Sequence, residues 1–234
     1  MQKDETLLND LTLILRRNEK VKPRNASTLI IKKKNNLEED SILMLLRHPG
    51  NAFVPSAWVF PGGAIESEDH DIEEFCVPLM DDYNKVSHKE DASILPYFIA
   101  SIRETFEETG ILYAYKNNEL LSINSKDDMD RFAQYRKKLY NKELTFRDIL
   151  EKENLTLAVD TLSYIDRWVT PSLFPIRYDA RFFYTNIVPN QEVSIDEIEV
   201  VKHKWITPSE AIKKNKTGEF PMVLPTVSVL KKIS

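Results

Sequence analysis

The sequence of 234 residues has a single cysteine, Cys76, and lacks any run of about 18 consecutive apolar residues. One cysteine forms neither an internal disulfide nor a multi-cysteine metal site, so we expect a reducing intracellular compartment. Without a long apolar run, we expect no membrane-spanning helix. Residues 1–20 also lack the cleavage pattern of a signal peptide. The sequence therefore predicts a cytoplasmic protein that keeps its N-terminus.

An excess of positive charge is absent as well. The 32 lysine and arginine residues are outnumbered by 37 aspartate and glutamate residues, which gives a formal net charge of -5. This balance offers no general attraction to a nucleic-acid duplex or to an anionic membrane. A polyanionic small-molecule substrate would therefore need local help from basic side chains or from metal ions.

Apolar residues make up 42% of the chain, which is enough for a folded core. A chain of 234 residues suits one domain, which we expect over residues 1–234, and it has no internal repeat of solenoid length. Apolar runs predict strands at 26–34, 41–49, 56–65, 111–116, 164–171, 180–189 and 197–206. Helical patterns lie at 94–110, 125–140, 145–155, 207–218 and 222–233. Strands before and after a central helix indicate an α/β or α+β fold with helices on the faces of a mixed sheet.

Three segments need their own interpretation. The charged run 31–40 predicts a hairpin turn between the first two strands, which would pair antiparallel. Residues 70–93 are polar and acidic, and we expect an insertion there with one short helix. The two helices within 125–153 are predicted to be surface additions.

The clearest helix, 94–110, has two opposed faces. An apolar stripe is expected to pack on the sheet: Leu95, Phe98, Ile99, Ile102 and Phe106. On the opposite side, Glu104, Glu107 and Glu108 share a wedge of about 100°. Their charges repel one another, and Arg103 neutralises only one of them. A divalent cation that prefers oxygen ligands, Mg²⁺ or Mn²⁺, would balance the remainder.

A solvated acidic helix face is the simpler interpretation of these glutamates taken alone. Two further signals favour a site. Gly62 and Gly63 follow a strand, and paired glycines allow the backbone to approach a ligand or metal closely. The acidic stretch 66–69 comes directly after them.

Together these segments resemble a Nudix box, whose pattern is G-x5-E-x7-R-E-U-x-E-E-x-G-U with U an apolar residue. Gly63 matches its glycine, and RETFEETGI at 103–111 matches its second half at every fixed position. Asp69 stands where the pattern has its first glutamate, and Glu68 is the alternative for that role. Between Asp69 and Arg103 there are 33 residues where the pattern has seven. One branch of the Nudix family is similar in both respects, and it includes the peroxisomal acyl-coenzyme A diphosphatases of animals.

The resemblance covers roughly residues 26–225 and implies an α/β/α sandwich around a mixed sheet, with hydrolysis of a diphosphate linkage. It implies catalytic roles for four residues of the box: Arg103, Glu104, Glu107 and Glu108. Glu104 and Glu108 would be the principal ligands of Mg²⁺ or Mn²⁺, with Glu107 beside them. The carbonyl of Gly63, or that of Gly62, and the carboxylate of Glu199, which we prefer to Glu197, would complete the set. Arg103 would orient a glutamate by ion pairing. The candidate substrate-binding residues are Arg47, Gly62 and Asp69, and Lys202 and Arg177 are further cations for the outer phosphates.

Similarity to this branch favours coenzyme A or acyl-coenzyme A as the substrate. A coenzyme A signature of another Nudix subgroup is not matched, so ADP-ribose, a nucleotide sugar or a dinucleoside polyphosphate stays an alternative. A catalytically silent Nudix module that senses a ligand or binds a protein is an alternative of another class, although all three box glutamates are present. The general base is open among Glu104, Glu107 and Glu199, and a homodimer is compatible with the sequence.

Several other residues with suggestive chemistry receive no role. His48 and His203 are not needed where a metal activates water, and Cys76 has no basic neighbour to lower its pKa. The aromatic side chains of Trp58, Phe60 and Trp205 are interpreted as core rather than as surfaces that stack on a base.

Overall fold

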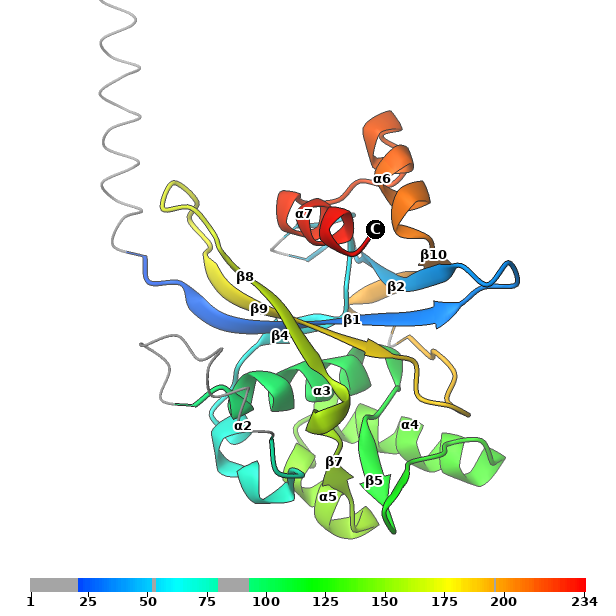
Figure 1. Cartoon of the computed structure of the whole chain (residues 1–234). Helices are drawn as coiled ribbons and strands as arrows, with labels where there is room; N and C mark the ends of the chain where they lie inside the picture. Colours follow the sequence, from blue (N-terminus) through cyan, green and yellow to red (C-terminus); the bar gives the residue numbers. More distant parts are fainter. Residues whose placement is uncertain (1–20, 52–53, 80–92, 196) are drawn as a thin grey trace, which may run out of the picture.

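The computed structural model describes residues 21–51, 54–79, 93–195 and 197–234 (Figure 1). Its strands are β1 (Arg24–Lys34), β2 (Asp40–Arg47), β3 (Trp58–Val59), β4 (Gly62–Ala64), β5 (Ala114–Lys116), β6 (Glu119–Leu120), β7 (Thr156–Leu157), β8 (Ser163–Val169), β9 (Tyr178–Asn186) and β10 (Val200–Ile206). Its helices are α2 (Glu68–Asp71), α3 (Leu95–Thr109), α4 (Lys126–Tyr140), α5 (Phe146–Glu153), α6 (Pro208–Thr217) and α7 (Leu224–Ile233). Single 3-10 turns lie at Glu73–Phe75 and Val159–Thr161.

A mixed sheet forms the centre of the molecule. Its order is β10-β2-β1-β9-β8, with β3 beside β2 and β4 beside β1. Strand β1 pairs antiparallel with β2 and parallel with β9. The predicted hairpin between the first two strands is thus confirmed, whereas the parallel neighbour of β1 comes from much later in the chain.

Helices cover both faces of this sheet (Figure 1). Helices α6 and α7 lie on one face, and α3 lies on the other. The two-residue period of a strand explains how β1 contacts both layers, because Ile30 joins the cluster of α6 and α7 while Leu29 and Ile31 join that of α3. The expected α/β/α sandwich around a mixed sheet is confirmed.

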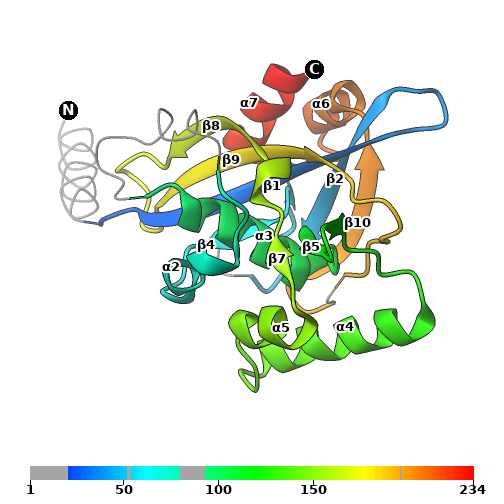
Figure 2. The same ribbon diagram turned by 60° about the horizontal axis from the view of Figure 1, so that its bottom comes forward.

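Helices α4 and α5 and the small sheet β6-β5-β7 lie beyond α3 (Figure 2). Their packing corrects the prediction of surface additions. Phe132 of α4 is buried edge-on against Phe106 of α3, with ring centroids 6.1 Å apart. Phe146 of α5 also packs against Phe106 at 6.3 Å. The addition at 125–153 therefore shares one core with α3.

Two strand predictions need correction. The run 56–65 is divided into β3, which pairs with β2, and β4, which pairs with β1. Pro61 lies between them and has no N–H to donate to a ladder. The run 111–116 forms strand only from Ala114 onward, and it belongs to the small sheet.

The insertion expected at 70–93 is described only in part. It begins with the end of α2 and the 3-10 turn, and residues 80–92 lie outside the described ranges. In the part of the chain that the structure describes, no helix combines the length and the apolar character needed to cross a membrane.

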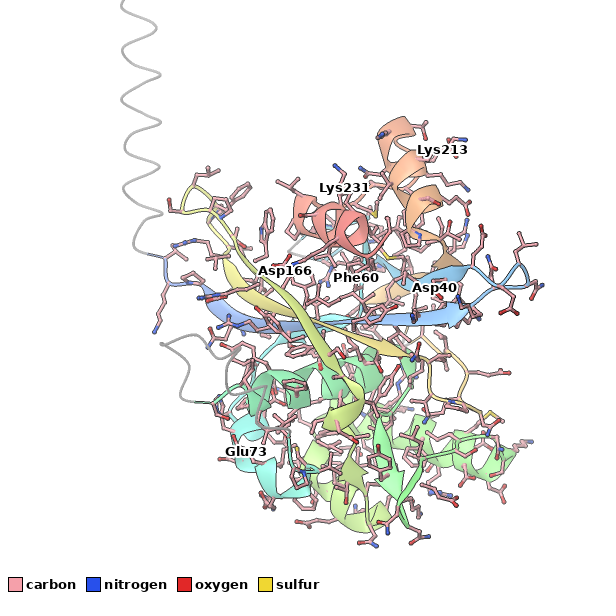
Figure 3. All side chains as sticks on the ribbon, in the orientation of Figure 1. Asp40, Phe60, Glu73, Asp166, Lys213 and Lys231 are labelled. Atoms are coloured by element: carbon pink, nitrogen blue, oxygen red, sulfur yellow. The ribbon has the colours of Figure 1, made fainter. Side chains whose placement is uncertain are left out.

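The aromatic residues before β4 belong to the core, as predicted. Trp58 stacks on Phe220 with ring centroids 4.2 Å apart. Phe60 is 3% exposed and lies in the layer between the sheet and α7 (Figure 3). Both rings are therefore on the face opposite α3.

Candidate active site

Helix α3 carries the crowded glutamates to the edge of β4. Its apolar residues pack on the sheet and on the cluster of α4 and α5, which fixes the rotation of the helix about its axis. The helix ends at Gly110, whose left-handed φ of 76° lets its N–H bond the carbonyl of Phe106. Glu104 and Glu108 consequently face the backbone of β4 and not open solvent.

Gly62 and Gly63 provide the space for these two carboxylates. The N–H of Gly62 donates a hydrogen bond of 3.0 Å to Oε2 of Glu108. A Cβ atom at Gly63 would lie 2.4 Å from the carboxylate carbon of Glu104, so only glycine leaves that side chain where it is. At Gly62, φ is +150° and a Cβ atom would meet the carbonyl oxygen of Ser27 at 2.3 Å. Gly63 thus leaves room for the Glu104 carboxylate, and Gly62 allows β4 to pair closely with β1.

Arg103 connects three carboxylates through one guanidinium group. Its Nε and Nη2 donate to both oxygens of Asp69 at 2.9 and 3.0 Å. Its Nη1 donates to Glu104 at 3.0 Å and to Glu107 at 3.2 Å. Nη2 also donates to the carbonyl of Ala64 in β4 at 3.0 Å. The arginine is 3% exposed, so its bonds to Asp69 and Glu104 lie in a largely dry environment, whereas the Glu107 side chain is 36% exposed.

Asp69 lies in a different position from the one expected of a substrate-binding residue. Its side chain is fully buried, and both of its oxygens accept from Arg103. Oδ2 also accepts from the N–H of Glu66 at 2.8 Å. A substrate cannot reach this carboxylate, and the prediction for Asp69 is therefore wrong. Asp69 instead holds Arg103 from the side opposite the glutamates.

Burial and mutual repulsion raise the pKa values of the glutamates. Burial raises the pKa of Glu104 to about 7, with Arg103 opposing and Glu107 reinforcing the shift. The pKa of Glu107 is also raised, again first by burial, against the lowering effect of Arg103. The carboxylates of Glu104, Glu107 and Asp69 together carry more negative charge than the single guanidinium of Arg103 can balance.

Glu108 shows which other charges lie nearby. Its pKa is raised well above 4.5, first by burial and then by the charge of Glu104. The N–H of Gly62 and the charge of Arg47 lower it, while Glu199 raises it. The structure therefore brings both Arg47 and Glu199 within electrostatic reach of Glu108.

The backbone explains how Glu199 comes to this place. Its carbonyl accepts from the N–H of His48 at 2.8 Å and from the side-chain amide of Asn51 at 3.1 Å. These bonds hold the segment before β10 against the end of β2, where Arg47 is the last residue. His48 stabilises the same turn, since its Nδ1 accepts from the N–H of Gly50 at 3.0 Å.

The other two candidate cations, Arg177 and Lys202, are not grouped with the glutamates. The guanidinium of Arg177 donates to the carbonyls of Thr170 and Val21, which holds it on the hairpin between β8 and β9. Lys202 is exposed on β10.

Cys76 is half-buried, and burial together with Glu73 and Glu74 raises the pKa of its thiol to about 12.

The chemistry of this donor set fits a hard divalent cation. Within the described ranges, no three Asp, Glu, His or Cys side chains already surround a common point. Glu104 is paired with Arg103 instead, and Glu108 with the N–H of Gly62. Buried carboxylates with an excess of negative charge are nevertheless the ligands that Mg²⁺ or Mn²⁺ prefers. Binding would require these side chains to exchange their present partners for the cation.

One residue at this site was missed by the sequence analysis. Arg136 of α4 donates from Nε and Nη2 to the carbonyl of Glu107, at 3.1 and 2.7 Å, and from Nη1 to the carbonyl of Ser194 at 2.6 Å. No local pattern signals this contact, because an arginine in a polar helix is ordinarily a solvated side chain.

Comparison with known proteins assigns the chain to a family. A crystal structure of a Nudix hydrolase from Alicyclobacillus acidocaldarius superposes with a TM-score of 0.73 at 24% identity, covering 91% of each chain, which shows a common fold. The family model described as the NUDT19 Nudix domain matches residues 77–233, more than half of the chain. The chain belongs to this family of Nudix domains.

Two curated relatives carry the name acyl-coenzyme A diphosphatase NUDT19. The protein from Xenopus laevis is 27% identical over 215 residues, which is 78% of this chain and 57% of that protein. The human protein is 25% identical over 207 residues, which is 73% of this chain and 54% of that protein. The chain thus spans a little more than half the length of these relatives.

Proposed function

We propose that the chain is a metal-dependent diphosphatase that hydrolyses the diphosphate linkage of a nucleoside diphosphate derivative. Coenzyme A or acyl-coenzyme A is the first choice of substrate, because the named relatives are acyl-coenzyme A diphosphatases. The observation that carries the proposal is the contact of Glu104 and Glu108 with the glycine pair of β4, in a buried region with excess negative charge.

The ligands of Mg²⁺ or Mn²⁺ would be Glu104, Glu107 and Glu108, with the carbonyl of Gly63 and the carboxylate of Glu199. The cation supplies charge neutralisation for the diphosphate and lowers the pKa of a bound water. Water adds to one phosphorus, the P–O–P bridge breaks, and two phosphate monoesters leave.

The protein groups have separate tasks in this reaction. Arg103 fixes the carboxylate of Glu104, and the N–H of Gly62 fixes that of Glu108. The proton released by the attacking water passes to Glu104, Glu107 or Glu199. Arg47 is proposed to bind an outer phosphate, because its charge lies close enough to Glu108 to lower the pKa of that carboxyl.

The competing hypothesis is a silent Nudix module that senses a ligand or binds a protein. Such a module has no need of a buried carboxylate cluster, which is costly to keep without a cation. Glu104, Glu107 and Glu108 are all present and adjacent to β4. We therefore favour the enzyme. The cytoplasmic location and the homodimer stay predictions of the sequence.

A hydrolysis screen tests the proposal. The purified chain is incubated with Mg²⁺ or Mn²⁺ and with coenzyme A, an acyl-coenzyme A, ADP-ribose, a nucleotide sugar and a dinucleoside polyphosphate, and products are identified by mass spectrometry. We expect cleavage of coenzyme A or its acyl form, and a loss of at least about 100-fold for Glu108→Gln. Glu119→Gln, an exposed glutamate of β6, is the matched control. Absence of cleavage of every diphosphate would refute the enzymatic function.

A further inference from the structure

Helix α4 reaches the end of α3 that carries the glutamates. Arg136 of α4 gives two hydrogen bonds to a single carbonyl, that of Glu107, which is itself a metal-ligand candidate and lies between Glu104 and Glu108 in the chain. A helix leaves its last four carbonyls without partners inside the helix, and a cation near them is favourable. Arg136 supplies both the donors and the charge.

Three of the four terminal carbonyls of α3 are satisfied in different ways. The carbonyl of Phe106 accepts from the N–H of Gly110, and that of Thr109 accepts from the N–H of Ser194. The carbonyl of Glu107 depends on Arg136. Arg136 is therefore the one side chain among these partners, and a substitution can remove it.

The same arginine also bonds Ser194, which precedes Glu199 in the chain. Its Nη1 donates to the carbonyl of Ser194, five residues before Glu199 in the chain. Ser194 is thus bonded twice to this region, through its N–H to α3 and through its carbonyl to α4. The end of α3 and the loop before β10 are joined at this point.

We propose that Arg136 is a positioning residue for the metal centre, which sets the separation between Glu108 on α3 and Glu199 before β10. The inference rests on the proposed function, because it assumes that these two carboxylates share a cation. It also gives the helical addition at 125–153 a role in the site, although no residue of that segment belongs to the Nudix box.

Packing of α4 on α3 does not require Arg136. Phe132 is 3% exposed and contacts Phe106 edge-on, so apolar burial holds the two helices together. Loss of the Arg136 side chain is therefore expected to leave α4 packed on α3 and to loosen the end of α3 and its contact with Ser194.

Direct Mn²⁺ binding to the full chain, followed by electron paramagnetic resonance without substrate, tests the inference. The variants are Arg136→Ala and Arg136→Lys. Lysine keeps the positive charge but lacks the planar guanidinium group, whose N–H groups donate to the carbonyls of Glu107 and Ser194 together. The matched control is Arg131→Ala on the same helix, because Arg131 bonds Glu153 of α5 and Asp128 of α4, and within the described ranges it gives no hydrogen bond to α3.

We expect Arg136→Ala to raise the Mn²⁺ dissociation constant about 10-fold, as loss of a supporting hydrogen bond does at other metal sites. Arg136→Lys should lie between this variant and the parent, and Arg131→Ala should match the parent. Equal Mn²⁺ affinity in the parent and in Arg136→Ala would overturn the inference. Should Arg136→Ala not fold, the same comparison is made with Arg136→Lys, and an unchanged affinity in that variant overturns it.

The outcome separates this inference from the proposed function. Since Mn²⁺ binding is measured without substrate, a parent that binds Mn²⁺ but cleaves no diphosphate counts against the enzyme alone. A parent that cleaves its substrate, with unaltered Mn²⁺ affinity in the Arg136 variants, counts against Arg136 alone.

Discussion

The carboxylate of Glu104 lies against the Cα atom of Gly63, so closely that a Cβ atom there would stand 2.4 Å from the carboxylate carbon. The contact joins the two halves of the Nudix box across the insertion. It also explains why glycine is needed at a position whose φ any residue can adopt. The neighbouring Gly62 is needed for another reason, namely its φ of +150° and its contact with the backbone of β1.

Substitution by alanine should affect activity at Gly63 and stability at Gly62. Gly63→Ala should displace the flexible end of Glu104, which lowers kcat at least about 10-fold with little change in the thermal midpoint. Gly62→Ala should destabilise the fold by about 2 kcal/mol or more, because the new Cβ meets backbone that cannot move aside. Thermal unfolding and kinetics on both variants check this, and equal effects of the two changes on stability would contradict it.

The ion pair of Asp69 and Arg103 predicts a loss of stability. Asp69→Asn keeps the shape of the side chain but replaces one of its two acceptor oxygens by an NH2 group, so one N–H of the buried guanidinium loses its acceptor. This loss should cost about 3 kcal/mol of unfolding free energy. Asp71→Asn, two residues later and exposed, should change it by less than about 0.5 kcal/mol. Urea denaturation measures both. Similar midpoints for the two variants would show that Asp69 does not support Arg103.

The raised pKa of Glu104 predicts how stability depends on pH without metal. The folded protein holds the Glu104 proton up to a pKa of about 7, whereas the unfolded chain releases it near 4.5. This stabilising contribution is complete below pH 4.5 and is lost as pH rises through 7, a change of about 2 to 3 kcal/mol.

Thermal melts in EDTA at pH 5 and pH 8 test this prediction. The parent should lose more stability between the two values than Glu104→Gln, which has no proton to release. Adding Mg²⁺ or Mn²⁺ at pH 8 should restore stability to the parent more than to the variant. Parallel pH profiles for parent and variant would rule out a raised pKa at Glu104.

Cys76 should be nearly inert toward thiol reagents. Burial and two nearby glutamates raise its pKa to about 12, so very little thiolate exists at pH 8. We expect the folded protein to react with iodoacetamide at least about 100-fold more slowly than the urea-unfolded chain. A rate similar to that of the unfolded chain would mean that the thiol is accessible and its pKa ordinary.

Local sequence patterns predicted the elements that carry the site. The predicted helix 94–110 corresponds to α3, because an apolar stripe with a glycine after it defines both the buried face and the end of the helix. The predicted strands 26–34 and 41–49 likewise correspond to β1 and β2. Resemblance to the Nudix box linked Gly63 with Arg103 although 39 residues lie between them.

Contacts between distant elements could not be predicted in this way. The division of the run 56–65 into β3 and β4 depends on which neighbour each half pairs with, and that choice is set by the whole sheet. The fully buried position of Asp69 depends on the docking of α2 against α3. Arg136 contacts α3 only after α4 has packed through Phe132. Each of these contacts is decided by tertiary packing, which a local sequence pattern does not show.

The glutamates crowded on α3 are proposed to hold a divalent cation. The most direct test is titration of the metal-free protein with Mn²⁺ at pH 7.5 by isothermal calorimetry, for the parent, Glu108→Gln and Glu119→Gln. We expect the parent and Glu119→Gln to bind alike, and Glu108→Gln to bind at least about 10-fold more weakly. Equal Mn²⁺ affinity in all three proteins would contradict the claim.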